Sequence, residues 1–331
     1  MRRNGLKETL RRGVYMMAAV LAACTMTACG SDDGGGTPPP EFTTPAYEAS
    51  AAKFDITDTD APYSSVELTA GGNYIIRLRE ITGSPEEDPN VQPAPGRVSF
   101  AAGPGQVAEG TRATVWSNIL YGKYTKTGDN EYTLEGYGKL TVTQKDGSAV
   151  SLHMVRTDGQ EYTISGNKAG NTATGANTDM LCRTWNIVEM RSYARLNGNT
   201  LYDITAGSLS ELVGKIVEWG KSMDESFSEE DVSGLLGDIP EPRQFVFSKS
   251  GTYMVLYEDD MLAVSTWRWK DQNAGVMQYS WNPDTFNDAY IAGEVTTAFS
   301  GKRLEITEVK TDSEDGYSMQ VGVVYILEEA K

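Results

Sequence analysis

The chain has 331 residues, a formal net charge of −17 and a hydrophobic content of 39%. This length gives room for two domains, and the 17 tyrosines and 6 tryptophans exclude an intrinsically disordered protein. An acidic surface repels the phosphate backbone, so we expect no nucleic-acid partner.

The first residues have the pattern of an export signal. Arg2, Arg3 and further basic residues precede an apolar run at residues 14–23. This run is too short to cross a bilayer, since a spanning helix needs about 20 apolar residues. A basic leader and a short apolar core are typical of a secretory signal, so we predict a signal peptide over residues 1–28. Without it the net charge becomes −21, from 24 basic and 45 acidic residues.

Two cysteines compete for the position of a lipid anchor. Residues 21–24 (Leu-Ala-Ala-Cys) and 26–29 (Met-Thr-Ala-Cys) both resemble the lipobox of bacterial lipoproteins. An acidic, glycine-rich stretch follows Cys29 and resembles the surface-export tag of Bacteroidota lipoproteins. The resemblance implies lipid attachment at Cys29, with Cys24 as the alternative. It also implies a lipid-anchored outer-membrane protein exposed on the cell surface, whose membrane contact is its lipid.

Changes in composition divide the mature chain. Residues 29–45 combine glycines with Pro-Pro-Pro and are predicted to be a flexible tether. Residues 167–179 are rich in Gly, Asn, Thr and Ala without apolar periodicity, which favours a linker. The linker separates an N-terminal β domain, residues 46–166, from a C-terminal domain, residues 180–331.

Both domains show the period-two alternation of β-strands, so we predict an all-β protein made of two antiparallel β-meanders. In the C-terminal domain this alternation predicts eight strands: 184–192, 243–248, 252–258, 262–269, 275–281, 292–299, 303–309 and 318–328. Eight strands joined mostly by short links can close into a barrel that holds side chains or one small ligand.

A helical insert interrupts this barrel between its first two strands, at about residues 194–242. Leucine, valine and isoleucine recur at helical spacing from Leu209 to Val217. Ser208 and Glu211 have the spacing of a capping box, and Gly220 is expected to end the helix. Ser228 begins a second predicted helical segment.

The N-terminal domain shows the same alternation, with turns expected at Asp146-Gly147 and Asp158-Gly159. Residues 68–76 align without gaps to residues 247–255. This alignment leaves two interpretations open: a duplicated β-meander, or a chance likeness between hairpins that share a glycine turn.

From Leu181 onward the chain resembles the lipocalin-like domains of Bacteroidota lipoproteins. The resemblance is carried by residues 181–185 (Leu-Cys-Arg-Thr-Trp), by 245–253, by Trp267-x-Trp269 and by the closing strand to Leu327. True lipocalins have Gly-x-Trp where this chain has Arg183-Thr184-Trp185. The resemblance implies a small lipocalin-like barrel, and ligand binding by analogy only.

Few catalytic sites can be built from this sequence. His153 is the only histidine, which excludes sites that need two. No nucleophile elbow, phosphate loop or dinucleotide fingerprint occurs in a plausible context, so we expect no catalytic residue, metal site or cofactor. A glycoside hydrolase, which needs only two carboxylates, is the remaining enzyme hypothesis. Cys182, outside the signal region, is expected to be structural.

An aromatic cluster gives the best functional indication. Its members are Tyr253, Tyr257, Trp267, Trp269, Tyr279 and Trp281. If they line the barrel they contact a small apolar ligand, and if the tryptophans face outward they stack on a glycan or a partner protein. Packing in the core is the alternative. We therefore predict a non-catalytic binding module, or else a structural or interaction lipoprotein with filled barrels.

Overall fold

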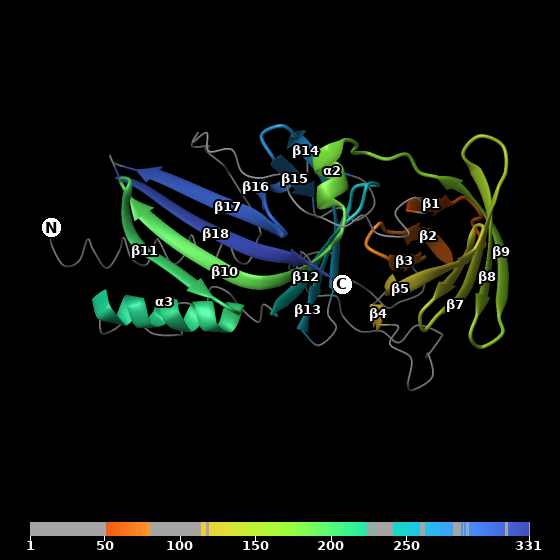
Figure 1. Ribbon diagram of the computed structural model, residues 1–331, viewed down its shortest axis with the longest axis horizontal. Helices are drawn as coiled ribbons and strands as arrows, with labels where there is room; N and C mark the ends of the chain where they lie inside the picture. The colour runs from red at the N-terminus through yellow and green to blue at the C-terminus, as the bar shows by residue number, and fades with distance from the viewer. Residues whose placement is uncertain are drawn as a thin grey trace, which may run out of the picture. The chain divides into compact units, whose positions relative to one another are not determined.

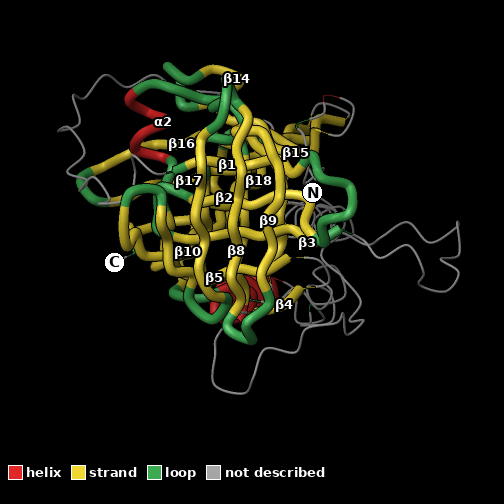
Figure 2. Tube along the Cα trace, turned by 90° about the vertical axis from the view of Figure 1, so that its right-hand side faces the viewer, coloured by secondary structure: helices red, strands yellow, loops and turns green. Residues whose placement is uncertain are grey.

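The computed structural model describes residues 51–79, 114–116, 119–223, 227, 241–258, 262–280, 286, 288, 291–314 and 317–330. The predicted signal peptide, Cys24, Cys29 and the tether lie outside these residues, as does the second helical segment from Ser228. The chain divides into two compact units (Figure 1). In the described part of the chain, the first comprises residues 51–183 and 247–251, and the second comprises residues 184–246 and 252–330. Strands dominate both units (Figure 2).

The first unit contains a closed barrel of eight antiparallel strands. Its ring strands are β1 (Ala52–Ile56), β2 (Tyr63–Leu68), β3 (Asn73–Leu78), β5 (Ile119–Gly128), β6 (Glu131–Leu134), β7 (Gly138–Gln144), β8 (Ala149–Arg156) and β9 (Glu161–Lys168). Each strand pairs with the next, and β1 pairs with β9 to close the ring. The short strand β4 (Thr114–Trp116) pairs with β5 but is not one of the eight ring strands.

Alternation along these strands explains the fold of the first barrel. Leu140, Leu152 and Met154 are fully buried, while His153, between two of them in sequence, is half exposed. Each of the eight strands contributes buried apolar side chains to one core. Tyr74 lies directly across from Gly122, where an added Cβ would stand 2.7 Å from the tyrosine ring. The Tyr74 ring therefore packs directly on the Gly122 backbone, a place that a residue with a side chain would occupy itself.

The predicted turns of this barrel are confirmed. Gly147 and Gly159 have φ angles of 61° and 84° and occupy the β7–β8 and β8–β9 connections. Positive φ is the conformation that a tight antiparallel hairpin requires and that glycine adopts without steric cost. Beyond β9, residues 169–175 connect to a short helix, α2 (Ala176–Leu181).

The second unit contains another closed eight-stranded antiparallel barrel, as the sequence predicted. Its ring strands are β10 (Thr184–Leu196), β12 (Pro242–Phe247), β13 (Thr252–Tyr257), β14 (Leu262–Asp271), β15 (Val276–Ser280), β16 (Ile291–Ser300), β17 (Arg303–Glu314) and β18 (Tyr317–Glu329). A long register between β10 and β18, from Trp185↔Glu329 to Leu196↔Met319, closes the ring.

The insert between the first two ring strands contains a strand as well as the predicted helix. β11 (Asn199–Ala206) pairs with the distal half of β10, and α3 (Leu209–Met223) packs against both strands (Figure 1). The sequence analysis missed β11, because β10 continues past residue 192 into a tight hairpin whose Asn197 has a φ of 49°.

The predicted cap of α3 is confirmed, but its predicted end is wrong. Ser208 Oγ accepts a hydrogen bond from Glu211 N at 3.1 Å, and the Glu211 carboxylate accepts one from Gly207 N at 2.8 Å. Gly220 lies inside the helix, which continues to Met223. An added Cβ at Gly220 would stand 2.3 Å from the ring of Phe227, so this glycine makes room for an aromatic side chain instead of ending the helix.

The two aligned segments occupy equivalent places in their rings. Residues 68–76 form the turn between the second and third ring strands of the first barrel, and residues 247–255 form the corresponding turn of the second. Gly72 and Gly251 have similar φ angles of 77° and 87°. This topological equivalence favours duplication over chance likeness.

Candidate binding site in the second barrel

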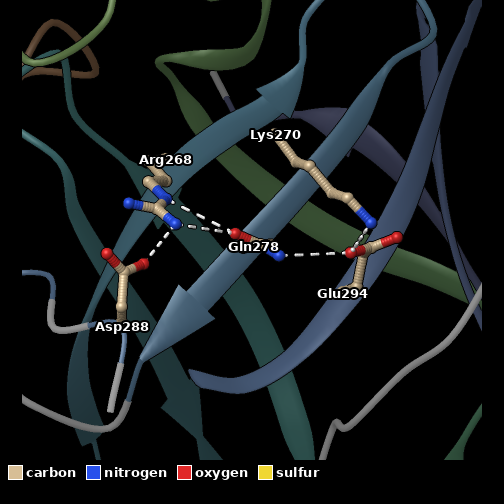
Figure 3. A network of polar contacts seen from close by, with 5 residues as sticks. All are labelled: Arg268, Lys270, Gln278, Asp288 and Glu294. Carbon is tan, nitrogen blue, oxygen red and sulfur yellow. Dashed lines mark hydrogen bonds and ion pairs between the residues drawn. The ribbon is translucent and has the colours of Figure 1, made fainter. Parts of the chain in front are cut away.

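The outer face of β14–β16 fixes which side chains point into the second barrel. Arg268 donates to Gln278 Oε1 at 3.1 Å, and Gln278 donates to Glu294 Oε2 at 3.2 Å (Figure 3). Lys270 also donates to Glu294 Oε2, at 2.7 Å, and Arg268 forms an ion pair with Asp288. These charged residues lie on the solvent side.

Trp267, Trp269 and Tyr279 alternate with this polar network and therefore lie on the opposite, inner face. Trp267 pairs with Tyr279 across the β14–β15 ladder, and Trp269 pairs with Met277, which is buried. The two tryptophan rings meet edge to face with centroids 5.4 Å apart. Their inward orientation removes them from a role in stacking on a glycan at the outer surface.

A row of aromatic rings continues along this inner face. Phe245 lies between Tyr325, at a centroid distance of 5.2 Å, and Tyr253, at 5.8 Å. Tyr253 in turn lies 6.0 Å from Tyr279. These are the separations of favourable edge-to-face and tilted aromatic pairs. The row joins strands that are far apart in the sequence, because β18 returns to the ring beside β10.

The structure thus places five of the six predicted aromatic residues. Tyr253, Trp267 and Tyr279 are buried, and Tyr257 and Trp269 are half-buried. Trp281 lies outside the described residues. Tyr325, which lies within the predicted strand 318–328, completes the row.

Glu308 on β17 is the unexpected residue of this interior. It lies on the same face as Leu304 and Ile306, and it pairs with the fully buried Val323 of β18. Its exposed fraction is 1%, and Oε1 has no hydrogen-bond partner among the residues that the structure describes. Burial raises the pKa of this carboxyl well above its ordinary value, and the charge of Lys310 opposes the rise.

Lys310, two residues further along β17, is the cation nearest to Glu308 in sequence on this face. It pairs with the buried Val321, and partial burial lowers its pKa while the charge of Glu308 opposes that shift. Its long side chain can place the ammonium group in water while the stem covers apolar surface.

A buried hydroxyl pair lies on the neighbouring strands. Ser192 of β10, which pairs with Val323, has its Oγ 3.2 Å from the hydroxyl of Tyr202 on β11. Burial raises the pKa of Tyr202 to about 12, and the hydrogen bond with Ser192 partly offsets this. The Tyr202 ring packs at 4.7 Å on Trp219 of α3, so the helix covers this end of the sheet.

The interior of the first barrel differs, because its polar groups are paired. The hydroxyls of Tyr63 and Tyr137 are 2.5 Å apart, and Tyr74 donates to Glu135 O at 2.8 Å. Burial raises the pKa of Tyr63 to about 12, with the bond to Tyr137 opposing the shift. This barrel has the features of a packed core.

The first unit also contains a buried acid that makes a useful comparison. Glu67 is 3% exposed, and its Oε1 accepts hydrogen bonds from Ser248 and, at 2.5 Å, from Ser250. Buried polar groups in folded proteins are normally satisfied in this way. Of the two buried acids in the described part of the chain, Glu308 is thus the one that departs from the rule.

Cys182, near the end of the first unit, is buried and unpaired with another cysteine. Burial raises the pKa of its thiol, chiefly by desolvation, so the nucleophilic thiolate is disfavoured. This agrees with the structural role that we expected.

Within the described ranges, no group of three or more His, Cys, Asp or Glu side chains is placed to hold a metal ion. No helix there is long and apolar enough to cross a membrane. No family model matches the chain, and a search of curated proteins finds no significant match.

Proposed function

We propose that the chain is an exported, lipid-anchored binding protein of the cell envelope whose second barrel takes a small apolar ligand. The observation that carries the proposal is the inner face of this barrel. It combines a row of aromatic rings with a buried carboxyl, that of Glu308, whose Oε1 has no hydrogen-bond partner among the described residues. Ligand sites are mostly apolar with a few convergent polar groups, and this interior has that composition.

The experiment is a fluorescence titration of the mature chain with N-phenyl-1-naphthylamine, a neutral apolar probe whose emission rises on transfer from water. Ser265 is buried on the inner face directly across from Tyr253, so Ser265→Phe adds bulk beside the aromatic row. Ser300 is exposed at the end of β16, and Ser300→Phe is the matched control.

We expect the probe to bind the wild-type chain, and Ser265→Phe to weaken binding at least about tenfold, or 1.4 kcal/mol. Ser300→Phe should bind as the wild type does. Absence of binding, or equal binding by the wild type and both variants, would remove the second barrel as the ligand site. Near-UV circular dichroism of each variant establishes that its tertiary structure is intact.

The anchor is tested separately. Metabolic labelling with a fatty-acid analogue should label the wild type and Cys24→Ala, and Cys29→Ala should lose the label. Labelling lost in Cys24→Ala alone would assign the anchor to Cys24. No labelling of the wild type would overturn the anchor altogether.

A structural or interaction lipoprotein is the second candidate, and the packed first barrel favours it. All eight ring strands of that barrel supply side chains to one apolar core. If the second barrel also excludes the probe, this candidate replaces ligand binding.

A further inference from the structure

Within the described residues, the strongest unexplained feature is the buried Oε1 of Glu308, which has no hydrogen-bond partner there. A buried carboxyl without a hydrogen bond destabilises the fold, and an isolated buried carboxylate does so far more. Glu67, which is just as buried, is satisfied by two serine hydroxyls. Glu308 pairs across the strands with Val323 and lies among apolar side chains of the inner face. A bound ligand that supplies the missing partner would offset this cost.

The surroundings of Glu308 favour a positively charged partner. Tyr325 lies two residues from Val323 on β18, which makes it the diagonal neighbour of Glu308 on the inner face. Such diagonal neighbours are about 7–8 Å apart at Cα, within the reach of an aromatic side chain. The aromatic row begins at this tyrosine and passes through Phe245 and Tyr253. Aromatic faces attract cations, and they do so more strongly away from water.

The net charge of the whole protein also favours a positively charged ligand. A net charge of −21 after removal of residues 1–28 raises the local concentration of cations and lowers that of anions. Lys310 is the nearby positive group, but it is only partly buried and its stem is long enough for the ammonium to reach solvent. A cationic ligand can therefore replace the Lys310 ammonium group beside Glu308.

We propose that Glu308 is the counter-ion for a protonated amine, so that the ligand of the second barrel is an apolar organic ammonium compound. The apolar body lies along the aromatic row, and the ammonium group donates hydrogen bonds to the Glu308 carboxylate. This inference rests on the proposed function, and it adds the charge and chemical class of the ligand.

Proton release accompanies binding wherever the free protein holds Glu308 protonated. The carboxylic acid loses its proton to the buffer, the ammonium keeps its own, and a carboxylate–ammonium pair remains. The titratable groups of the surrounding inner face include Lys310 on the same strand, Tyr325 on β18, the row tyrosines Tyr253 and Tyr279 and, beyond Ser192, Tyr202 on β11. Burial raises the pKa of Tyr202 to about 12, so its hydroxyl stays neutral near pH 7.

The test uses three probes with one apolar body and different polar ends: 4-phenylbutylammonium, 4-phenylbutyrate and 4-phenylbutanol. Their binding to the mature chain is measured by isothermal titration calorimetry at pH 7. We expect the ammonium probe to bind at least about tenfold more tightly than the other two. In Glu308→Gln this preference should fall to within about threefold. Glu305→Gln, on the exposed face of the same strand, is the matched control and should keep the preference.

A second measurement on the wild type does not depend on any variant. Titration of the ammonium probe in two pH 5 buffers of different ionisation enthalpy should show proton release on binding, because the raised pKa of Glu308 favours its protonated form there, and the alcohol probe should show none. This readout keeps the inference testable if Glu308→Gln fails to fold.

The outcomes separate the two proposals. If all three probes bind equally, or if 4-phenylbutyrate binds best, Glu308 is not a counter-ion. The barrel would still bind apolar ligands in that case. A preference for the ammonium that survives in Glu308→Gln also overturns the assignment. If none of the probes binds and N-phenyl-1-naphthylamine does not bind either, the proposed function itself is wrong.

Discussion

The buried carboxyl of Glu308 predicts an unusual dependence of stability on pH. Its pKa in the folded state is raised above that in the unfolded chain, so the folded state holds the proton more tightly. Stability from this group is therefore fully present below the unfolded-state pKa, and it is lost as pH rises towards the folded-state pKa. In Glu308→Gln this loss is absent, so the variant should gain stability relative to wild type as pH rises.

The size of this gain follows from linkage. Each pH unit between the two pKa values changes the free energy of unfolding by up to about 1.4 kcal/mol, so the difference between the two proteins grows with pH until the folded-state pKa is reached. Groups that do not interact with Glu308 titrate alike in both proteins and cancel, whereas Lys310 does not. The favourable charge of Lys310 and the new amide, which must itself be satisfied, both reduce the observed figure.

The assay is urea unfolding at pH 5, 6 and 7, followed by tryptophan fluorescence. Five of the six tryptophans lie after residue 183, so the signal reports mainly on the second barrel. Glu305→Gln is the control, and its free energy of unfolding should change with pH as that of the wild type does. Parallel stability curves for wild type and Glu308→Gln across this range would refute a raised pKa for Glu308.

Three further predictions concern packing. Gly322→Ala should destabilise the second barrel by about 1–3 kcal/mol, because the new Cβ would stand 2.2 Å from the Tyr193 ring, and an unchanged urea midpoint would contradict this. Gly214→Ala, in open space on α3, should stabilise the chain by up to about 1 kcal/mol, and a lower midpoint would count against it. Cys182 should react with Ellman's reagent only when the first unit is unfolded in urea, whereas rapid reaction of the folded protein would show that the thiol is accessible.

Much of the architecture was predictable because apolar alternation is a local signal. The eight ring strands of the second barrel and the helical insert follow from it, and the closing β10–β18 pair follows from meander connectivity. β11 (Asn199–Ala206) was missed because it lies inside the insert that was predicted to be helical. It follows β10 after a turn of only two residues. The end of α3 was misplaced because Gly220 serves a tertiary contact with Phe227, which no local rule contains.

The candidate site was only partly predictable. The aromatic cluster was visible in the sequence, but the face to which Trp267 and Trp269 belong needed the register with Gln278 and Met277. Glu308 was overlooked, although a signal was present. It falls on the same alternation as Leu304 and Ile306, and an acid at a core-facing position of a strand is a departure worth following. That its Oε1 has no partner could be learned only from the neighbouring strands.

The most direct test of a ligand site inside the second barrel is a crystal structure of the mature chain soaked with 4-(4-bromophenyl)butylamine. Anomalous scattering then locates the bromine independently of the fitted protein. The account predicts a bromine peak within the ring of β10 and β12–β18, with the amine nitrogen at hydrogen-bond distance from Glu308. A well-occupied bromine peak found only on the outer surface of the barrel would contradict it.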